Sequence, residues 1–487
     1  MVTSTEPIRQ VSNLIGGAWL PARSGRTLTR ENPADTGQVV ATCPASGPAD
    51  VDAAMAAAQE AAPGWAATAV EDRVAVIGRA LDLLEARSAE LVAADVRESG
   101  KTLADCEGEV SRALAATRYQ LKIAPDLLYG SRVLDSGLEV TLERAPVGVA
   151  ALVTPWNYPF SAVLRKTVPA LVAGNAAVVK PSELTPVTAE LVGAALGEAG
   201  LPDGVLNLVY GAGSEVGQAL VDHPGLGAIS FTGSARVGLG LAGQVGDRDV
   251  KLQVEMGGKN PLVVLADADL PAAVDAAVAA SFTAAGQWCI ATSRIIVEEP
   301  VFARFRDELV ARSRALRVGD GFDPDVDMGP VSSRVQYEKV LSHLSPDRLS
   351  GTVLCGGSAL TGPAHAGGYF IAPTVVERPD PGSATVQEEI FGPVVSLLGA
   401  ADLDDAIAQA NGTPYGLCAA IFTASDDQAR RFARAVDVGR VGVNLPTSIG
   451  DLTVPGGGRK NSGRGEYEGA GDGIVFFTHL KPVFFRR

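Results

Sequence analysis

The chain has 487 residues, of which 46% are hydrophobic and 20% are charged, and its formal net charge is -15 at pH 7. This composition is typical of globular proteins and excludes a disordered chain, and the length allows about three domains of ~150 residues each. No basic block precedes Arg486 and Arg487, which argues against a nucleic-acid surface because such a surface needs clustered basic residues.

The N-terminal segment MVTSTEPIRQ lacks the basic and then apolar design of a secretory signal. Asp, Asn or Pro interrupts every long apolar stretch before it reaches the ~18 residues that a membrane span needs. The five cysteines are widely spaced and form no CxxC pair, which suits reduced thiols better than a disulfide framework or a zinc site. We therefore expect a cytoplasmic protein with no membrane partner, no nucleic-acid partner and no metal.

In chain order, the patterns predict short strands at residues 13–19 and 39–42 and helices from 49 to about 128. From residue 147 to residue 264, apolar runs alternate with helical stretches, which is the βαβ signature of a doubly wound parallel sheet. A second α/β region follows, from about 271 to 444. The apolar runs are VGVAALV (147–153), AAVVK (176–180), VLNLVY (205–210), AISFT (228–232) and PLVVL (261–265).

Two further segments indicate a surface element. Residues 136–144 (SGLEVTLER) alternate apolar and polar side chains, as in a half-exposed strand that would suit a sheet edge. Residues 474–485 (IVFFTHLKPVFF) are too apolar to be left in water. We expect this tail to dock on an apolar surface, such as that of another subunit.

Cys289 lies in the segment ASFTAAGQWCIATSR (280–294) between two predicted elements. The Ala-rich stretch 271–285 predicts a helix that stops at Gly286, and the β-branched run 295–297 predicts a strand. A thiol in this connection can act as a nucleophile, with its own amide N–H beside a developing oxyanion. A small buried hydrophobe is the alternative for a cysteine taken alone.

Glycine and serine positions near the predicted strands are suited to a nucleotide. Gly211, Gly213 and Gly217 are spaced one residue wider than the usual dinucleotide fingerprint, so a plain glycine turn fits equally well. Ser234 follows the strand AISFT and begins a short helix, where free amides and the helix dipole favour a phosphate. An ordinary serine cap is the alternative at that position.

Lys180 and Glu183 follow the C-terminal end of another predicted strand, the edge at which open α/β sheets bind ligands. Lys180 can hold ribose hydroxyls or a phosphate, and Glu183 can accept from a ribose 2′-hydroxyl. A carboxylate there would repel a 2′-phosphate, so NAD is favoured over NADP. A solvated ion pair is the alternative.

A general base is predicted at Glu255, between a strand-like stretch and a Gly–Gly turn, because apolar surroundings should raise the pKa of its carboxyl. Asn157, in the loop TPWNYPF, could aim its side-chain amide at an oxyanion. None of the four histidines lies near Cys289 in sequence, which disfavours a Cys–His hydrolase.

Taken together, PWNYP, KPSE, FTGS, EMGGKN, GQWC and EEIFGP, in this order, resemble the NAD(P)-dependent aldehyde dehydrogenase superfamily over nearly the whole chain. The resemblance implies that Cys289 attacks the aldehyde to form a thiohemiacetal, and that Asn157 and the Cys289 amide hold the oxyanion. It implies hydride transfer to NAD and hydrolysis of the thioester by water that Glu255 activates. It also places cofactor contacts at Thr154, Trp156, Lys180, Ser182, Glu183, Gly213, Gly217, Phe231, Thr232, Gly233, Ser234, Val237, Met256, Gly257, Glu389 and Phe391, with Glu389 on the nicotinamide ribose.

The same resemblance implies a domain plan and a homodimer or homotetramer. The dinucleotide-binding domain would comprise residues 1–123 and 147–257, and the catalytic domain residues 258–444. Residues 445–471 would return to the active site, and residues 124–146 and 472–487 would form an oligomerisation flap.

One motif departs from the family pattern. SGRGEYEG replaces the usual SGxGRExG, so that Glu466 and Tyr467 fall where Arg and Glu are usual. This departure puts in doubt the proton relay expected at Lys166, for which Glu468 is a substitute. Met256 stands where Leu is usual, which is a near-isosteric change.

Residues on the substrate side leave the aldehyde open. Arg165 falls where succinate-semialdehyde dehydrogenases carry an Arg for the substrate carboxylate, but some aromatic-aldehyde members carry it too. Thr283 stands where the succinate-semialdehyde enzymes tend to have a second Arg, and Tyr158 and Trp288 add aromatic walls. The substrate expected first is a carboxylate-bearing semialdehyde, namely succinate semialdehyde, and an aromatic or an aliphatic aldehyde is the alternative.

Two other kinds of function are weighed against oxidation to the acid. CoA-acylating members usually lack the carboxylate found here at Glu255, and non-catalytic members usually lose the nucleophile or its base. Both groups are present in this chain, which favours hydrolysis of the acyl-enzyme.

Overall fold

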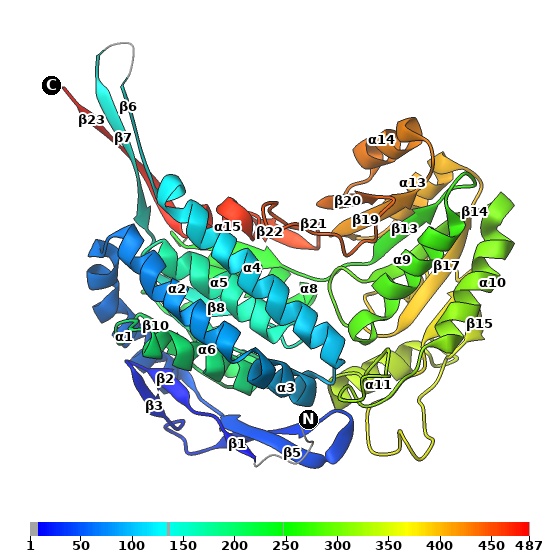
Figure 1. Cartoon of the computed structure of the whole chain (residues 1–487), viewed down its shortest axis with the longest axis horizontal. Coiled ribbons are helices and arrows are strands. Elements are labelled where there is room, and N and C mark those ends of the chain that lie inside the picture. The colour runs from blue at the N-terminus through cyan, green and yellow to red at the C-terminus, as the bar shows by residue number, and fades with distance from the viewer. Residues whose placement is uncertain (1–7, 134–136, 247, 487) are drawn as a thin grey trace.

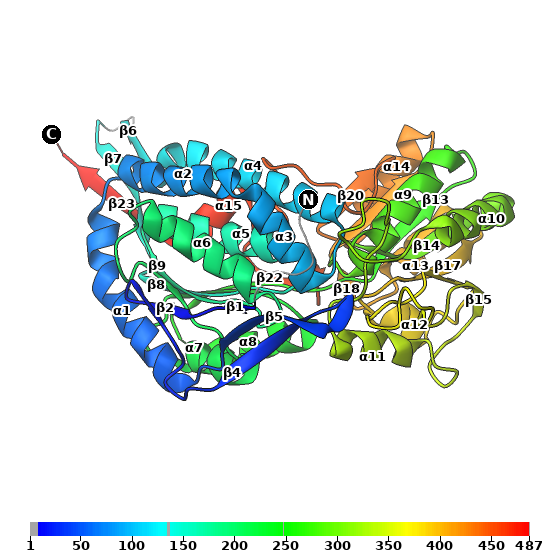
Figure 2. The same cartoon turned by 60° about the horizontal axis from the view of Figure 1, so that its bottom comes forward.

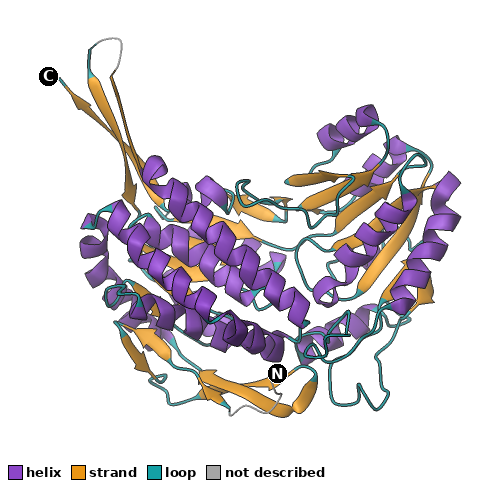
Figure 3. Cartoon of the chain, in the orientation of Figure 1, coloured by secondary structure: helices purple, strands orange, loops and turns teal. Residues whose placement is uncertain are grey.

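The computed structural model describes residues 8–133, 137–246 and 248–486. Figure 1 shows two α/β bodies side by side and a narrow β arm that projects from the first body. Figure 3 shows helices over the sheets of both bodies. Within the described ranges, no helix combines the length and the apolar character that a membrane crossing would need.

The first body is built on an eight-stranded sheet whose five central neighbours, β12 to β10, are parallel. This confirms the predicted parallel sheet, and the central strands are nearly all buried because helices cover both faces. In sheet order the strands are β22 (Gly463–Gly465), β12 (Lys251–Glu255), β11 (Ala228–Thr232), β8 (Val149–Val153), β9 (Ala176–Lys180), β10 (Leu206–Leu208), β2 (Asn13–Ile15) and β3 (Ala18–Leu20).

Two apolar clusters, one on each face of this sheet, hold the covering helices. One contains α2 (Val70–Ala86), α3 (Ser88–Ser99), α4 (Leu103–Leu128), α5 (Pro159–Val172), α6 (Pro186–Glu198) and α15 (Ala470–Phe476). The other contains α1 (Pro48–Ala67), α7 (Gln218–Asp222) and α8 (Ala235–Val245). Figure 2 shows α1, α7 and α8 on the side of the sheet away from α2 and α4.

The second body contains a seven-stranded sheet in which all neighbours from β16 to β20 are parallel. Its strands, in sheet order, are β15 (Thr352–Cys355), β16 (Thr374–Glu377), β17 (Val394–Ala400), β14 (Thr292–Glu298), β13 (Asn260–Val264), β19 (Cys418–Phe422) and β20 (Arg440–Val443). Its helices are α9 (Leu270–Phe282), α10 (Glu299–Ala315), α11 (Arg334–His343), α12 (Ala384–Gln387), α13 (Leu403–Asn411) and α14 (Asp426–Ala435).

Small sheets complete the fold. One joins β1 (Arg9–Gln10), β5 (Asp35–Pro44) and β4 (Thr27–Asn32), and another pairs β18 (Tyr415–Gly416) with β21 (Arg459–Lys460). The division into domains is not tested by this sheet order and stays a prediction.

The helix before Cys289 ends earlier than its sequence indicates. Helix α9 stops at Phe282, and not at residue 285, because Ala284 and Ala285 have left-handed φ angles of 51° and 54°. A tertiary contact favours this turn over the helix: Asp105, from α4, accepts the Ala284 N–H (3.2 Å). Alanine has high helix propensity, so only the packed structure could reveal the break.

The β arm corrects the edge-strand expectation. Its order is β23 (Thr478–Phe485), β7 (Glu139–Pro146), β6 (Tyr129–Val133), so β7 is the middle strand, while Ser136 lies outside the described residues. The C-terminal tail pairs with β7 of its own chain over eight residues. Ile474 and Phe476, at the start of the apolar tail, are buried in α15.

Candidate active site

Cys289 lies in a turn between α9 and β14, as the sequence predicts. Of the five cysteines, the other four are buried and Cys289 is partly exposed. A residue that the sequence reasoning missed holds this turn: Asn260 donates from Nδ2 to the carbonyl oxygens of Cys289 (2.7 Å) and Ala291 (2.9 Å). The only sequence signal for this role is an Asn directly after Gly–Gly–Lys at the start of a buried strand.

Asn157 lies at the same turn. It follows β8, and its Nδ2 donates to the carbonyl oxygen of Gln287 (2.8 Å), two residues before the nucleophile. Gln287 is itself fixed, because its Oε1 accepts the Ser332 N–H (2.8 Å). The fold therefore brings an amide donor from the first body to the cysteine turn of the second.

Glu255 is the last residue of β12, and its Oε2 accepts the Gly458 N–H (3.2 Å). Burial, together with the nearby Glu468 charge, raises the pKa of the Glu255 carboxyl well above its usual range. Burial also raises the pKa of the Cys289 thiol to about 11, while the Arg165 charge lowers it and the Glu255 charge raises it. Because the thiol is protonated near neutral pH, a proton acceptor close by is chemically useful.

Lys166 is buried and donates to Ser230 Oγ (2.8 Å) and to the carboxylate of Glu468. Burial lowers the pKa of the Lys166 ammonium, and the Glu468 charge opposes that shift. Glu466 instead pairs with Lys251 (3.0 Å) and is 45% exposed. The substitute suggested from the sequence, Glu468, is thus the carboxylate that contacts Lys166.

Predicted cofactor positions gather at the C-terminal edge of the first sheet. Ser234 is the N-cap of α8 but its side chain makes no capping hydrogen bond, so the hydroxyl is not used as an ordinary cap. Gly233, beside Phe231 and Thr232 at the end of β11, donates its N–H to the Glu255 carbonyl oxygen (3.1 Å). Val237, one turn into α8, is 42% exposed.

Lys180 and Glu183 form an ion pair (3.1 Å) at the end of β9, in which the Lys180 side chain is 5% exposed and Glu183 36%. The Thr154 N–H donates to the Lys180 carbonyl oxygen (3.2 Å), and Ser182 Oγ accepts the Leu184 N–H (3.2 Å). The ion pair weighed as an alternative does form, with its carboxylate on the accessible side.

Glu389 reaches the same edge from the second body. Its Oε1 accepts the Gly258 N–H (3.0 Å), and a Cβ added to Gly257 would lie 1.9 Å from it, so a larger residue at Gly257 would displace the Glu389 carboxylate from this position. Burial raises the pKa of the Glu389 carboxyl, and the Lys339 charge opposes this. Phe391 has a φ of 59° and contacts Trp156 edge-on, with ring centroids 5.5 Å apart.

The remaining glycine motif forms a π-helical turn at Gly213–Gly217, followed by the short α7. A Cβ added at Gly213 or Gly217 would meet nothing within 4 Å. The glycine that its backbone requires is Gly211, whose φ is 151° and whose Cβ would lie 3.0 Å from the Ser46 carbonyl oxygen. Met256 is buried beside Gly238 of α8.

On the substrate side, Tyr158 and Trp288 stack with ring centroids 5.8 Å apart and an angle of 21°. The Arg165 side chain is 50% exposed, and its Nη1 lies 3.7 Å from Glu468 Oε2. Arg165 is thus partly balanced by a carboxylate of its own chain, with half of its surface open.

The aldehyde dehydrogenase family model matches residues 19–483. The chain belongs to the aldehyde dehydrogenase family. Its fold is that of the family, and the chain is an oxidoreductase that acts on aldehydes.

Relatives support this membership over almost the full length. An α-ketoglutaric semialdehyde dehydrogenase of Bacillus subtilis is 37% identical over 97% of this chain and 98% of its own. An α-ketoglutarate semialdehyde dehydrogenase of Haloferax volcanii is 39% identical, with coverage of 97% and 98%. The structure of a Staphylococcus aureus betaine aldehyde dehydrogenase in complex with NAD+ has a TM-score of 0.93 at 31% identity, covering 97% of this chain and 94% of that one.

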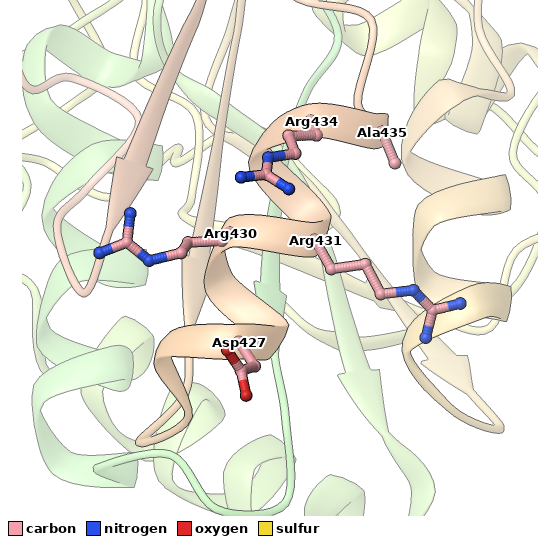
Figure 4. A pocket seen from close by; sticks show the side chains of 5 residues that line it. All are labelled: Asp427, Arg430, Arg431, Arg434 and Ala435. Carbon is pink, nitrogen blue, oxygen red and sulfur yellow. The ribbon is translucent and has the colours of Figure 1, made fainter.

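A depression on α14 lies outside this constellation and includes none of the predicted site residues. It is lined by Asp427, Arg430, Arg431, Arg434 and Ala435 (Figure 4), and Arg431 contacts Asp404. Helix α14 packs with α13 in a different apolar cluster from α9, which leads to Cys289. The depression on α14 and the turn that carries Cys289 are therefore separate features of the second body.

Proposed function

We propose that the chain oxidises an aldehyde to a carboxylic acid with NAD, through a covalent adduct on Cys289. The observation that carries the proposal is the meeting, at one turn, of the partly exposed Cys289 thiol and the amide of Asn157, with the Glu255 carboxylate near enough to shift the thiol pKa. A nucleophile, an oxyanion donor and a base in this arrangement are the parts that acyl chemistry needs.

In the first step, Cys289 Sγ forms a bond to the aldehyde carbon as the thiol proton passes to solvent water, the π bond of the carbonyl breaks, and the carbonyl oxygen becomes an oxyanion. The Asn157 Nδ2 and the Cys289 N–H donate to that oxygen. NAD, when bound, supplies the acceptor for the hydride that leaves the same carbon, so that a Cys289 thioester remains. Glu255 then takes a proton from water as the water oxygen attacks the thioester, and the acid and the free thiol are released.

The charges of the Lys166–Glu468 pair would act on the general base, Glu255. Both Glu468 and Lys166 change the pKa of the Glu255 carboxyl, the first raising it and the second lowering it. We propose that Lys166 and Glu468 keep the pKa of the Glu255 carboxyl in a range that suits a general base. We also propose that they form a path along which protons reach and leave Glu255.

The residues at the sheet edge fit a dinucleotide. The first amides of α8 lack intrahelical partners and suit a phosphate, while the side chain of Ser234 leaves them uncapped. Glu183 and Glu389 would accept from the two riboses, and Gly257 keeps the space that the Glu389 carboxylate occupies. The accessible carboxylate of Glu183 supports NAD over NADP, because a 2′-phosphate would be repelled.

For the substrate we propose a semialdehyde that carries a carboxylate. Arg165 has a half-exposed guanidinium on α5, and its positive charge lowers the pKa of the Cys289 thiol. The two relatives reported above bear names that refer to α-ketoglutarate semialdehyde, and not to succinate semialdehyde. Thr283, in place of a second Arg, also disfavours succinate semialdehyde.

Arg165→Ala should lower kcat/KM for α-ketoglutarate semialdehyde by about 10- to 100-fold, since a charged hydrogen bond contributes ~1.5–3 kcal/mol. A neutral aldehyde of similar length should change by about twofold at most. Arg118→Ala, which removes an arginine that is 40% exposed and paired on the outer surface, is the matched control and should change neither substrate. An equal loss for both aldehydes would contradict carboxylate recognition by Arg165.

The function itself is tested by a panel of carboxylated, aromatic and aliphatic aldehydes, each with NAD and with NADP. We expect the highest kcat/KM for a carboxylated semialdehyde with NAD, and free acid as the product. A product that is acyl-CoA when CoA is added, with no free acid, would assign the chain to CoA-acylating chemistry instead.

The β arm is the surface that we propose for a homodimer or homotetramer. Leu480, Phe484 and Phe485 of β23 and Tyr129 of β6 are exposed large side chains, and both strands are edges of a three-stranded sheet. An exposed apolar edge of this kind invites a second chain.

A further inference from the structure

A buried ionic cluster lies behind the aromatic wall of the site. Lys101, just after α3, is 3% exposed and lies 2.9 Å from Asp95 Oδ2, and it also donates to the carboxylate of Glu109. The side chains of Asp95 and Glu109 are fully buried. Buried charges are costly even when they are paired, so the residues that this cluster contacts indicate what it could position.

The lysine contacts the residues beside the nucleophile. Its Nζ lies 4.3 Å from the centroid of the Tyr158 ring, a cation–π distance. Tyr158 stacks on Trp288, which precedes Cys289 directly. A continuous set of contacts therefore runs from the Lys101 ammonium to the reactive turn.

Glu109, which pairs with Lys101, also contacts the start of helix α5, next to Tyr158. Glu109 Oε1 accepts the Ser161 N–H (2.8 Å) in the first turn of α5, where Tyr158, as the N-cap, makes no side-chain capping bond. An amide at a helix start needs such an acceptor, and here it comes from α4. Helix α5 carries Arg165 and Lys166, so Glu109 fixes the origin of the helix that bears both groups.

We propose that Lys101, held by Asp95 and Glu109, is a positioning residue for aldehyde oxidation, which fixes Tyr158 against Trp288 and so sets the aldehyde-side wall next to Cys289. The inference rests on the proposed function. Lys101 touches neither the reacting sulfur nor the base, so it acts through Tyr158 and the start of α5. The position of the bound aldehyde therefore depends on Lys101 more than the reactivity of the Cys289 thiol does.

Lys101→Met should lower kcat/KM for the aldehyde by about 10- to 100-fold, mainly by raising KM, since misplacement of a reactant by ~1 Å can cost 100-fold. The Kd for NAD should change by less than about twofold. In a Tyr158→Leu background, the same substitution should lower kcat/KM by no more than about twofold, because the two residues act in series. Lys101→Arg, which keeps a cation near the ring, should restore most of the loss.

Arg73→Met is the matched control for loss of a buried cation that contacts the same helix, α5. Arg73 donates from Nε to the Val172 carbonyl oxygen (2.9 Å) at the opposite end of α5. This variant should lower the melting temperature and leave kcat/KM within about twofold of the wild type. A loss of kcat/KM as large as that of Lys101→Met, or equal losses from Lys101→Met in both Tyr158 backgrounds, would overturn the proposal.

Two measurements keep the outcome clear if the single variant does not fold. The Asp95→Asn/Lys101→Met variant removes a negative charge together with the ammonium, and it replaces Lys101→Met in the same kinetic test. Tyr158→Leu by itself should reproduce most of the loss of kcat/KM. An unchanged kcat/KM in Tyr158→Leu would refute the role. If the wild type oxidises no aldehyde, the proposed function fails, and the near-ultraviolet circular dichroism of wild type and Lys101→Met still tests whether Lys101 orders the stacked pair.

Discussion

Cys289→Ala is expected to abolish aldehyde oxidation, with kcat/KM lower by roughly four to six orders of magnitude, the scale seen when a covalent nucleophile is removed. The reason is that Cys289 is the partly exposed thiol at the turn, whereas the remaining four cysteines are buried, including Cys418, whose Sγ lies 3.9 Å from the Ile290 carbonyl oxygen and whose side chain is shielded from the site. Formation of NADH is the direct measurement. The affinity for NAD should remain within about twofold, because Cys289 is not among the proposed cofactor contacts.

A second cysteine provides the control for this prediction. Cys355 is a buried thiol on β15, the edge strand of the second sheet, and Cys355→Ala should retain kcat/KM while losing about 1 kcal/mol of stability to the small cavity. Iodoacetamide at one equivalent should label Cys289 alone and inactivate the enzyme in proportion. Steady turnover by Cys289→Ala at even one hundredth of the wild-type rate would require another nucleophile.

The strands of the first sheet were predictable because helices cover both of its faces. Strands β8, β9 and β11 are continuous apolar runs in the sequence, and runs of this kind are typical of parallel strands. The residues that follow parallel strands lie at the edge formed by the carboxyl ends of those strands. The sequence pattern is therefore sufficient to place Asn157 and Lys180 at the same edge of the sheet.

Features set by contacts between distant segments were beyond this reasoning. The end of α9 at Phe282 depends on Asp105, more than 170 positions earlier, and local helix propensity gives the wrong limit. The place of β7 in the arm depends on which strand the C-terminal tail pairs with. Asn260 ends the motif EMGGKN, but the motif does not indicate that this side chain holds the Cys289 turn, and no distinctive pattern surrounds Lys101. The roles of both residues are visible only from what they contact.

Glu255→Gln is expected to slow kcat by about 10²- to 10⁴-fold, the usual contribution of a general base, while hydride transfer continues. The first turnover should therefore appear as a rapid burst of NADH of about one equivalent per Cys289, followed by slow release of acid. Glutamine is nearly isosteric and can still accept the Gly458 N–H that Glu255 now accepts, so the turn should stay in place. Rapid-mixing measurements of NADH, with acid-quenched detection of the acyl-enzyme, separate the two phases.

The pH dependence of this variant follows from the raised pKa of the Glu255 carboxyl. Burial, with Glu468, favours the protonated form, so in the wild type the fraction able to accept a proton, and with it kcat, should rise as pH increases through that pKa. Glu255→Gln should lose this rising limb.

The raised pKa also sets how the stability of the folded protein depends on pH. A carboxyl whose pKa is higher in the folded state than in the unfolded state makes the protein less stable as pH rises from the unfolded pKa through the folded one. Glu255→Gln should therefore be at least as stable as the wild type at neutral and alkaline pH. Glu466→Gln, which removes an exposed carboxylate beside Lys251, should show neither effect. Undiminished steady turnover by Glu255→Gln, with no burst, would mean that water is activated by another group.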